Sequence, residues 1–193
     1  MGLADSGTRP RLYLIDGSGY VYRAFHALPG LGTTRGVPTN AVYGFTNMLA
    51  KLLREEQPRH VAVVFDAPGG TFRDGLYADY KATRAPLPDE LRPQLGYVRK
   101  IVAALRLPVV EVPGVEADDV IGTLARQAGA TGLETVIVTG DKDLMQIVGP
   151  HVTLFDTMKD RRIGPDEVVE YDPERDVIVV RAGFVATGGP ADD

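Results

Sequence analysis

The stretch RLYLID, residues 11–16, is a short apolar run that ends in an acid. The arrangement recurs at residues 60–65, HVAVVF followed by Asp66, and at residues 135–139, TVIVT followed by Gly140 and Asp141. Short runs rich in Val, Ile and Leu, bounded by polar residues or Gly, are typical of strands buried on both faces of a parallel sheet. We therefore predict a parallel sheet in which an acid follows each of three strands.

Amphipathic segments separate these runs. Two further apolar runs, residues 108–112 and 151–155, are predicted to be strands. Apolar side chains recur at helical spacing over residues 42–53, with Thr39 as the predicted N-cap, over 95–105, and over 120–128, where Gly129 ends the pattern. Strands that alternate with helices predict an α/β fold in which helical crossovers join parallel strands.

The composition is that of a globular protein with one core. The 193 residues include 44% hydrophobic residues and carry a net charge of −5, from 21 Lys and Arg against 26 Asp and Glu. Cys is absent, which excludes disulfide scaffolds and thiolate metal sites and fits a reducing compartment. No run approaches the roughly 18 apolar residues that a membrane span needs. We expect a cytoplasmic monomer without a membrane partner.

Acidic residues gather at the predicted strand ends. The carboxyl ends of parallel strands share one edge of the sheet, and ligands bind at that edge. Asp16, Asp66 and Asp141 should therefore converge. Four more acids stand close by in sequence, three of them in VEADD before a predicted helix and one in TGDKD: Glu116, Asp118, Asp119 and Asp143.

Seven carboxylates in one cleft need a positive partner. One pair of like charges at 4 Å costs about 4 kcal/mol at an effective dielectric near 20. Raised pKa values or bound cations can relieve this repulsion, and we favour cations because oxygen ligands suit Mg²⁺ or Mn²⁺. Two ions about 3.5–4 Å apart support in-line displacement at a phosphodiester. A single Asp after a strand is most often a turn former or helix cap, but the full set is not explained in that way.

The irregular segment from residue 68 to 93 interleaves aromatic and cationic side chains. Such a surface suits single-stranded nucleic acid, because bases stack on rings at about 1–3 kcal/mol each while Lys and Arg meet phosphates. A solvated, charged helix face is the alternative, because acids such as Asp74 and Asp79 stand in the same stretch. The residues concerned include Phe72, Arg73, Tyr77, Tyr80, Lys81 and Arg84.

Six motifs together resemble the 5′ nuclease domain family of bacterial DNA polymerase I. They are LIDGSGYVYRAFHAL (14–28), NAVYGF (40–45), VVFDAPGGTFR (63–73), YADYKATRAP (77–86), VPGVEADDVIGTLA (112–125) and VTGDKDLMQIV (138–148). The resemblance spans roughly residues 11–171 and extends to the flap endonucleases and other PIN-like nucleases. It implies a three-layer PIN-like α/β fold, with a central, mostly parallel sheet flanked by helices and a helical arch, about residues 68–93, over the active site.

The resemblance also implies roles for individual residues. Asp16, Asp66, Glu116 and Asp118 would hold a first metal ion, while Asp141 and Asp143 would hold a second, with Asp119 between them. Tyr80, Lys81 and Arg84 match the arch, and Lys81 and Arg84 would be the catalytic cations. These three residues, with Arg23 and Arg73, would grip the 5′ strand and the scissile phosphate.

The C-terminal segment, residues 172–193, departs from the family pattern. The family carries a final pair of acids in the form Gly-Asp-x-x-Asp-Asn, where this chain has Gly188 to Asp193. In that alignment Gly189 replaces the first acid, and Asp192 is the retained metal ligand. We expect the duplex-binding helix-hairpin-helix region to be absent, and residues 1–10 to form a flexible tail. Binding to DNA should then be weak and sensitive to salt.

The favoured function is a metal-dependent 5′-3′ exonuclease or flap endonuclease. It would hydrolyse DNA phosphodiesters at 5′ ends or at junctions between single strand and duplex, in replication and repair. A truncated, weak or inactive DNA-binding fragment is the first alternative. A haloacid dehalogenase-like phosphatase would need an acid where Ser18 stands, two residues after Asp16. A Toprim-type nuclease would explain Asp141 and Asp143 but leave Asp16, Asp66 and the VEADD cluster unused.

Overall fold

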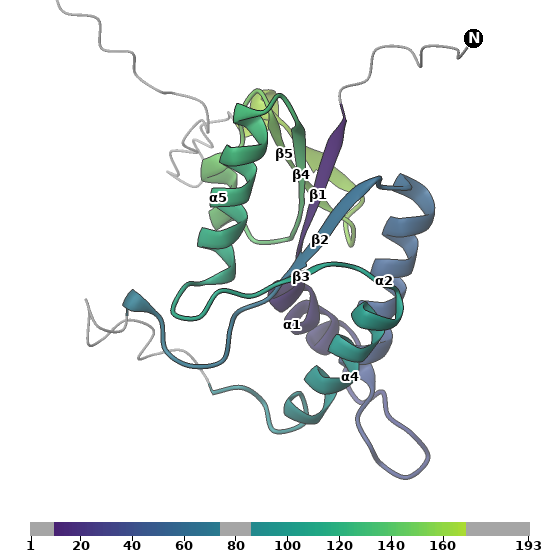
Figure 1. The fold of residues 1–193 in the computed structure, drawn as a ribbon. Coiled ribbons are helices and arrows are strands. Elements are labelled where there is room, and N and C mark those ends of the chain that lie inside the picture. Colours follow the sequence, from purple (N-terminus) through teal and green to yellow (C-terminus); the bar gives the residue numbers. More distant parts are fainter. Residues whose placement is uncertain (1–9, 74–85, 169–193) are drawn as a thin grey trace, which may run out of the picture.

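The computed structural model describes residues 10–73 and 86–168 (Figure 1). These residues form a six-stranded sheet in the order β3-β2-β1-β4-β5-β6, in which neighbouring strands are parallel except for the pair of β5 and β6. The strands are β1 (Arg11–Asp16), β2 (His60–Val64), β3 (Val109–Val110), β4 (Glu134–Val138), β5 (Val152–Asp156) and β6 (Arg161–Ile163). The helices are α1 (Gly17–Ala27), α2 (Asn40–Glu56), α4 (Arg92–Ala104) and α5 (Ala117–Ala130), with the short 3-10 helices η1 (Asp143–Ile147) and η2 (Pro165–Val168).

Alternating side chains of the strands divide the core into two halves. Tyr13 and Ile15 of β1 pack with α1, α2 and α4, whereas Leu14 packs with α5 on the opposite face. This division is the expected consequence of a strand's two-residue repeat. Figure 1 shows the resulting three layers, with α5 on one side of the sheet and α1, α2 and α4 on the other. The predicted α/β fold with a mostly parallel central sheet is confirmed.

The elements differ from the sequence prediction in three places. The run 108–112 forms only the two-residue edge strand β3, which pairs with β2 alone. Strand β6 was not predicted because two of its three residues are exposed arginines and only Ile163 is buried. Helix α1 was not predicted because Gly17 and Gly19 stand in its first turn, where they weaken the helical signal.

The N-terminus of α2 is capped from another helix. Thr39 occupies the N-cap position as predicted, but its side chain makes no capping hydrogen bond. Gln94 of α4 does this instead: its Oε1 accepts from the backbone N–H groups of Ala41 at 2.9 Å and Val42 at 3.2 Å, and its Nε2 donates to Asn40 Oδ1 at 2.8 Å. Gln94 is 1% exposed, so this buried amide fixes α2 against α4.

We predict that Gln94→Leu lowers the free energy of unfolding by about 2–3 kcal/mol. Leucine is similar in size but leaves two buried N–H groups of α2 without their acceptor, and each such group costs about 1–3 kcal/mol. Urea unfolding followed by circular dichroism measures the loss. Gln127→Leu, at an exposed position of α5, is the matched control and should change stability by less than about 0.5 kcal/mol. Equal stability of the two variants would contradict the capping role.

Several predicted features lie outside the described residues. They are residues 74–85 of the expected arch, with Tyr80, Lys81 and Arg84, residues 1–9 of the expected tail, and the segment 172–193 with Asp192. In the part of the chain that is described, no helix is long and apolar enough to cross a membrane.

Candidate active site

Three predicted acids meet where the strand order reverses. Strand β1 lies between β2 and β4. The chain first adds β2 and β3 on one side of β1, and then adds β4, β5 and β6 on the other side. The register sets Asp16 level with Val64, two residues before Asp66, and sets Ile15 level with Val138, three residues before Asp141. The carboxyl ends of β1, β2 and β4 therefore open at one edge, the position where α/β sheets bind ligands.

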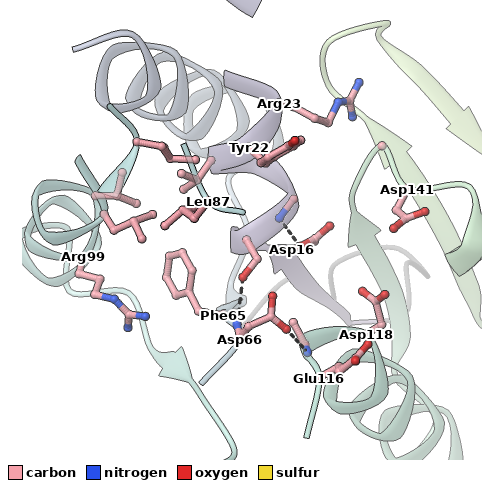
Figure 2. A pocket seen from close by; sticks show the side chains of 18 residues that line it. Asp16, Tyr22, Arg23, Phe65, Asp66, Leu87, Arg99, Glu116, Asp118 and Asp141 are labelled. Atoms are coloured by element: carbon pink, nitrogen blue, oxygen red, sulfur yellow. Dashed lines mark hydrogen bonds between the residues drawn. The ribbon is translucent and has the colours of Figure 1, made fainter. Parts of the chain in front are cut away.

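Five of the seven predicted acids line one cavity of about 630 Å³ (Figure 2). A second cavity, of about 540 Å³, shares two of these acids with the first. The first cavity holds Asp16, Asp66, Glu116, Asp118 and Asp141, and the second holds Glu116, Asp118, Asp119 and Asp143. All seven described acids thus surround two cavities that adjoin at Glu116 and Asp118.

Asp16 is fixed at the centre of the first cavity. It is the N-cap of α1, where its Oδ1 accepts from the backbone N–H of Gly19 at 2.8 Å, and its Oδ2 accepts from the Thr139 hydroxyl at 2.9 Å. A Cβ on Gly19 would come within 2.1 Å of Asp16 Oδ2, so only glycine leaves room for this carboxylate. The second glycine of the GSG sequence after Asp16 therefore serves the placement of the acid.

Asp66 connects the end of β2 to the start of α5. Its Oδ1 accepts from the backbone N–H of Ala117 at 2.8 Å, and its own N–H donates to Ser18 Oγ at 2.9 Å. Ala117 is the first residue of α5, and Glu116 occupies the N-cap position. The positive end of the helix dipole favours the acids gathered there, Glu116 and Asp118 among them.

Burial and, after it, mutual repulsion raise the pKa values of two acids in the first cavity. Burial, followed by the charges of Asp16, Asp141, Asp66 and Glu116, raises the pKa of Asp118 to about 6. Burial also raises the pKa of Asp16, against the hydrogen bonds from Gly19 and Thr139, and Asp141 and Asp66 add to the rise. The cavity therefore favours a positive ligand or a proton on these carboxylates.

Two arginines that were predicted to grip DNA each hold an acid. Arg73 donates through Nη2 to Asp119 Oδ1 at 2.7 Å and through Nη1 to Asp119 Oδ2. Its Nη1 also lies 3.6 Å from Glu116 Oε2. Arg23 donates through Nη2 to both carboxylate oxygens of Asp156 at 3.0 Å. Arg73 thus balances part of the acidic charge in the second cavity, and Arg23 lines the first.

The acids share a cavity without forming a closed set of ligands. Over residues 10–73 and 86–168, no group of three or more His, Cys, Asp or Glu is placed to hold one metal ion. Several of these carboxylates instead accept hydrogen bonds from N–H and hydroxyl donors. The residue types fit a hard divalent ion, because every available donor is an oxygen.

Sequence reasoning missed Thr139 and the apolar side of the cavity. The Thr139 hydroxyl donates to Asp16 and accepts from the backbone N–H of Asp141 at 3.0 Å, so it couples two acids. Its place before Gly140 and Asp141, at a strand end, was the only available signal. Apolar and aromatic side chains, mainly from α1 and α4, also line the cavity: Val21, Tyr22, Phe65, Leu87, Leu91, Leu95 and Val98.

Comparison with known proteins identifies the family of this chain. A family described as 5′-3′ exonuclease, N-terminal resolvase-like domain, matches residues 11–172. The chain belongs to this 5′-3′ exonuclease family. The match covers both cavities in full, because all the residues that line them lie between Asp16 and Ile147.

Relatives of the 5′-3′ exonuclease domain include whole polymerases. DNA polymerase I of Rhizobium leguminosarum is 52% identical over 167 residues, which are 82% of this chain and 16% of that protein. A 5′-3′ exonuclease of Aquifex aeolicus is 44% identical over 159 residues, 82% of this chain and 55% of that protein. The chain thus spans about a sixth of the polymerase and about half of the exonuclease.

A solved structure shares the fold of this exonuclease domain. The T5 5′-exonuclease with bound divalent zinc ions superposes with a TM-score of 0.65 at 20% identity, over 82% of this chain and 59% of that one. At this identity the likeness concerns the fold. It confirms the predicted α/β architecture with a central, mostly parallel sheet flanked by helices for the described elements.

Proposed function

We propose that the chain is a divalent-metal-dependent 5′-3′ exonuclease and flap endonuclease that hydrolyses DNA phosphodiesters. The single observation that carries the proposal is the gathering of five carboxylates in one cavity at the switch point of the sheet. Family membership and the 44% identity to an Aquifex aeolicus 5′-3′ exonuclease support it. We further propose that it acts as a monomer in the cytoplasm, in replication and repair.

The proposed metal ligands are the acids around the two cavities. Asp16, Asp66, Glu116 and Asp118 would hold one Mg²⁺ or Mn²⁺ ion, and Asp141 and Asp143 a second, with Asp119 between them and Asp192 as a further ligand outside the described residues. When bound, such ions lower the pKa of a water and stabilise the leaving oxygen. The raised pKa values of Asp16 and Asp118 support this proposal, because a bound cation would stabilise the ionised carboxylates that burial and the neighbouring acids disfavour.

The remaining cavity walls suit a nucleotide strand. Tyr22 is 48% exposed and stands in the wall beside Asp16, where its ring is open to a base. Figure 2 shows Arg23 beyond Tyr22 on the side of Asp141, and Phe65, Leu87 and Arg99 on the other side. We propose that Arg23 and Arg73 contact phosphates, together with Tyr80, and that Lys81 and Arg84 are the catalytic cations.

We predict Mg²⁺-dependent cleavage of a 5′-labelled flap, and a loss of about 100-fold or more in Asp141→Ala. Asp141 lines the cavity, and its removal deletes a proposed ligand while Asp16 and Thr139 keep their hydrogen bond. Gel analysis of the products, with Mg²⁺ and with EDTA, measures the rate and the position of the cut. If neither the wild-type chain nor Asp141→Ala gives a Mg²⁺-dependent product, the inactive-fragment alternative is supported instead.

A further inference from the structure

A fixed carboxylate stands beside the acidic cavity without belonging to its proposed metal ligands. Asp156, the last residue of β5, is 7% exposed. Arg23 Nη2 donates to both of its oxygens at 3.0 Å, and Asp156 Oδ1 also accepts from the backbone N–H of Met158 at 3.0 Å. The turn after β5 therefore locks the orientation of the carboxylate, and the carboxylate in turn holds one end of the guanidinium.

A second contact ties the same two elements together. Tyr20, fully buried on α1, shares a hydrogen bond with the hydroxyl of Thr157, the residue after Asp156. Tyr20 precedes Arg23 by one helical turn, so both side chains project from the same face of α1. Two neighbouring residues at the end of β5 thus hold α1 at two successive turns, which restricts how far Arg23 can move.

The guanidinium is also fixed against β4. A Cβ placed on Gly140 would lie 1.3 Å from Arg23 Nη1, so Arg23 occupies the space that any other residue at position 140 would fill. Gly140, Asp141 and Arg23 line the same cavity. Within the described residues, Arg23 Nη1 is buried and has no hydrogen-bond partner. The Arg23 side chain as a whole is 24% exposed, so a phosphate in the cavity can reach the rest of it.

We propose that Asp156 is a positioning residue that aims Arg23 at a phosphate of the substrate strand. By holding Nη2, it fixes the guanidinium beside Gly140 in the wall of the cavity, where the partly exposed Arg23 side chain meets the phosphate, and it keeps the guanidinium from pairing with the acids of the cavity, which the metal ions need. The inference rests on the proposed function, because it takes Arg23 to be a phosphate contact. Asp156 itself touches neither substrate nor metal in this scheme.

A double-mutant cycle on flap cleavage tests the proposal. Asp156→Ala should lower kcat/KM by about 10–100-fold, because small misplacements of a substrate-positioning group have effects of this size. In an Arg23→Ala background, the same substitution should change kcat/KM by less than about twofold, because the group that it positions is already gone. Asp156→Asn, which keeps an acceptor for the Met158 N–H, should lie between wild type and Asp156→Ala. Additive losses in the double variant would overturn the proposal.

A matched control separates positioning from stability. Glu56 accepts from Arg162 at 2.5 Å and from Tyr13 at 2.7 Å, and it lines neither cavity. Glu56→Ala also removes an ion pair to arginine, so it should lower the melting temperature without changing kcat/KM. A comparable activity loss in Glu56→Ala would show that any weakening of the fold suffices, and would overturn the proposal.

A binding measurement tests the positioning role of Asp156 separately from the proposed nuclease function. If the wild-type chain does not cleave the flap with Mg²⁺, the proposed nuclease function fails, and the same cycle is measured as affinity for a 5′-phosphorylated single-stranded oligonucleotide in Ca²⁺ by fluorescence anisotropy. Positioning by Asp156 predicts affinity at least about fivefold weaker in Asp156→Ala, and no further weakening in the Arg23→Ala background. Unchanged affinity in Asp156→Ala, or no binding by the wild-type chain, overturns the inference.

Discussion

Asp16→Asn should abolish Mg²⁺-dependent flap cleavage, with a rate at least about 1000-fold below wild type. Asp16 is buried at the centre of the cavity, and its charge is among those that raise the pKa of Asp118. Loss of a metal ligand removes several kcal/mol of transition-state stabilisation, and each 1.36 kcal/mol is a factor of ten in rate. Single-turnover cleavage at saturating protein measures the effect.

Asparagine is the informative replacement at this position. It keeps an oxygen for the Gly19 N–H, its amide NH₂ can donate to the Thr139 hydroxyl in place of the second carboxylate oxygen, and it is a good N-cap, so α1 should keep its cap. Asp160→Asn is the control, because that side chain is 74% exposed and lines neither cavity, and its cleavage rate should equal that of wild type. Should Asp16→Asn retain more than a tenth of the wild-type rate, Asp16 would not be a metal ligand.

Local patterns in the sequence are sufficient for the parallel part of the sheet and for the acids at its edge. Strands buried on both faces are continuous apolar runs, and parallel order brings their carboxyl ends together, so the amino-acid pattern by itself places Asp16, Asp66 and Asp141 at one edge. Asp118 and Glu116 follow because they begin a helix that packs on the same sheet. These inferences need only short-range information and a fold class.

The contacts that orient the site could not be predicted in this way. Arg73 and Asp119 are 46 residues apart, and Arg23 and Asp156 are 133 apart. Each pairing depends on the register of distant elements, and an arginine near acids is equally consistent with a phosphate contact. The capping role of the buried Gln94 could not be predicted either, because Gln94 accepts from two N–H groups of another helix, which are 53 and 52 residues away in the sequence.

Asp118→Asn should stabilise the metal-free protein at pH 8 by about 1 kcal/mol. The pKa of Asp118 is raised to about 6 from its ordinary 3.8, so ionising this side chain costs more in the folded chain than in the unfolded one. The stability associated with the protonated form is complete below about pH 4 and is lost as the pH rises through about 6. The expected gain is kept small because the side chain is only half-buried and solvent screens its charge.

Urea unfolding in EDTA, at pH 8 and at pH 4, measures this effect. The gain should be present at pH 8 and absent at pH 4, where Asp118 is neutral in the wild-type chain as well. Asp119→Asn is the matched control on the adjacent residue, because Asp119 is paired with Arg73 and its neutralisation should not stabilise the protein. If Asp118→Asn is less stable than wild type in EDTA at pH 8, the cost of ionising the buried Asp118 among other acids is not the dominant effect at this site.

Magnesium should make the wild-type chain more stable than Asp118→Asn, which reverses their order in EDTA. An ion that binds only the folded state stabilises it by about 2.7 kcal/mol at a concentration 100 times its dissociation constant. The wild-type chain should gain this stability, whereas Asp118→Asn lacks one proposed ligand and should gain much less at the same concentration. The carboxylate that weakens the metal-free fold is therefore expected to strengthen the metal-bound one, and a cavity that merely tolerated buried acids for packing would show no such reversal.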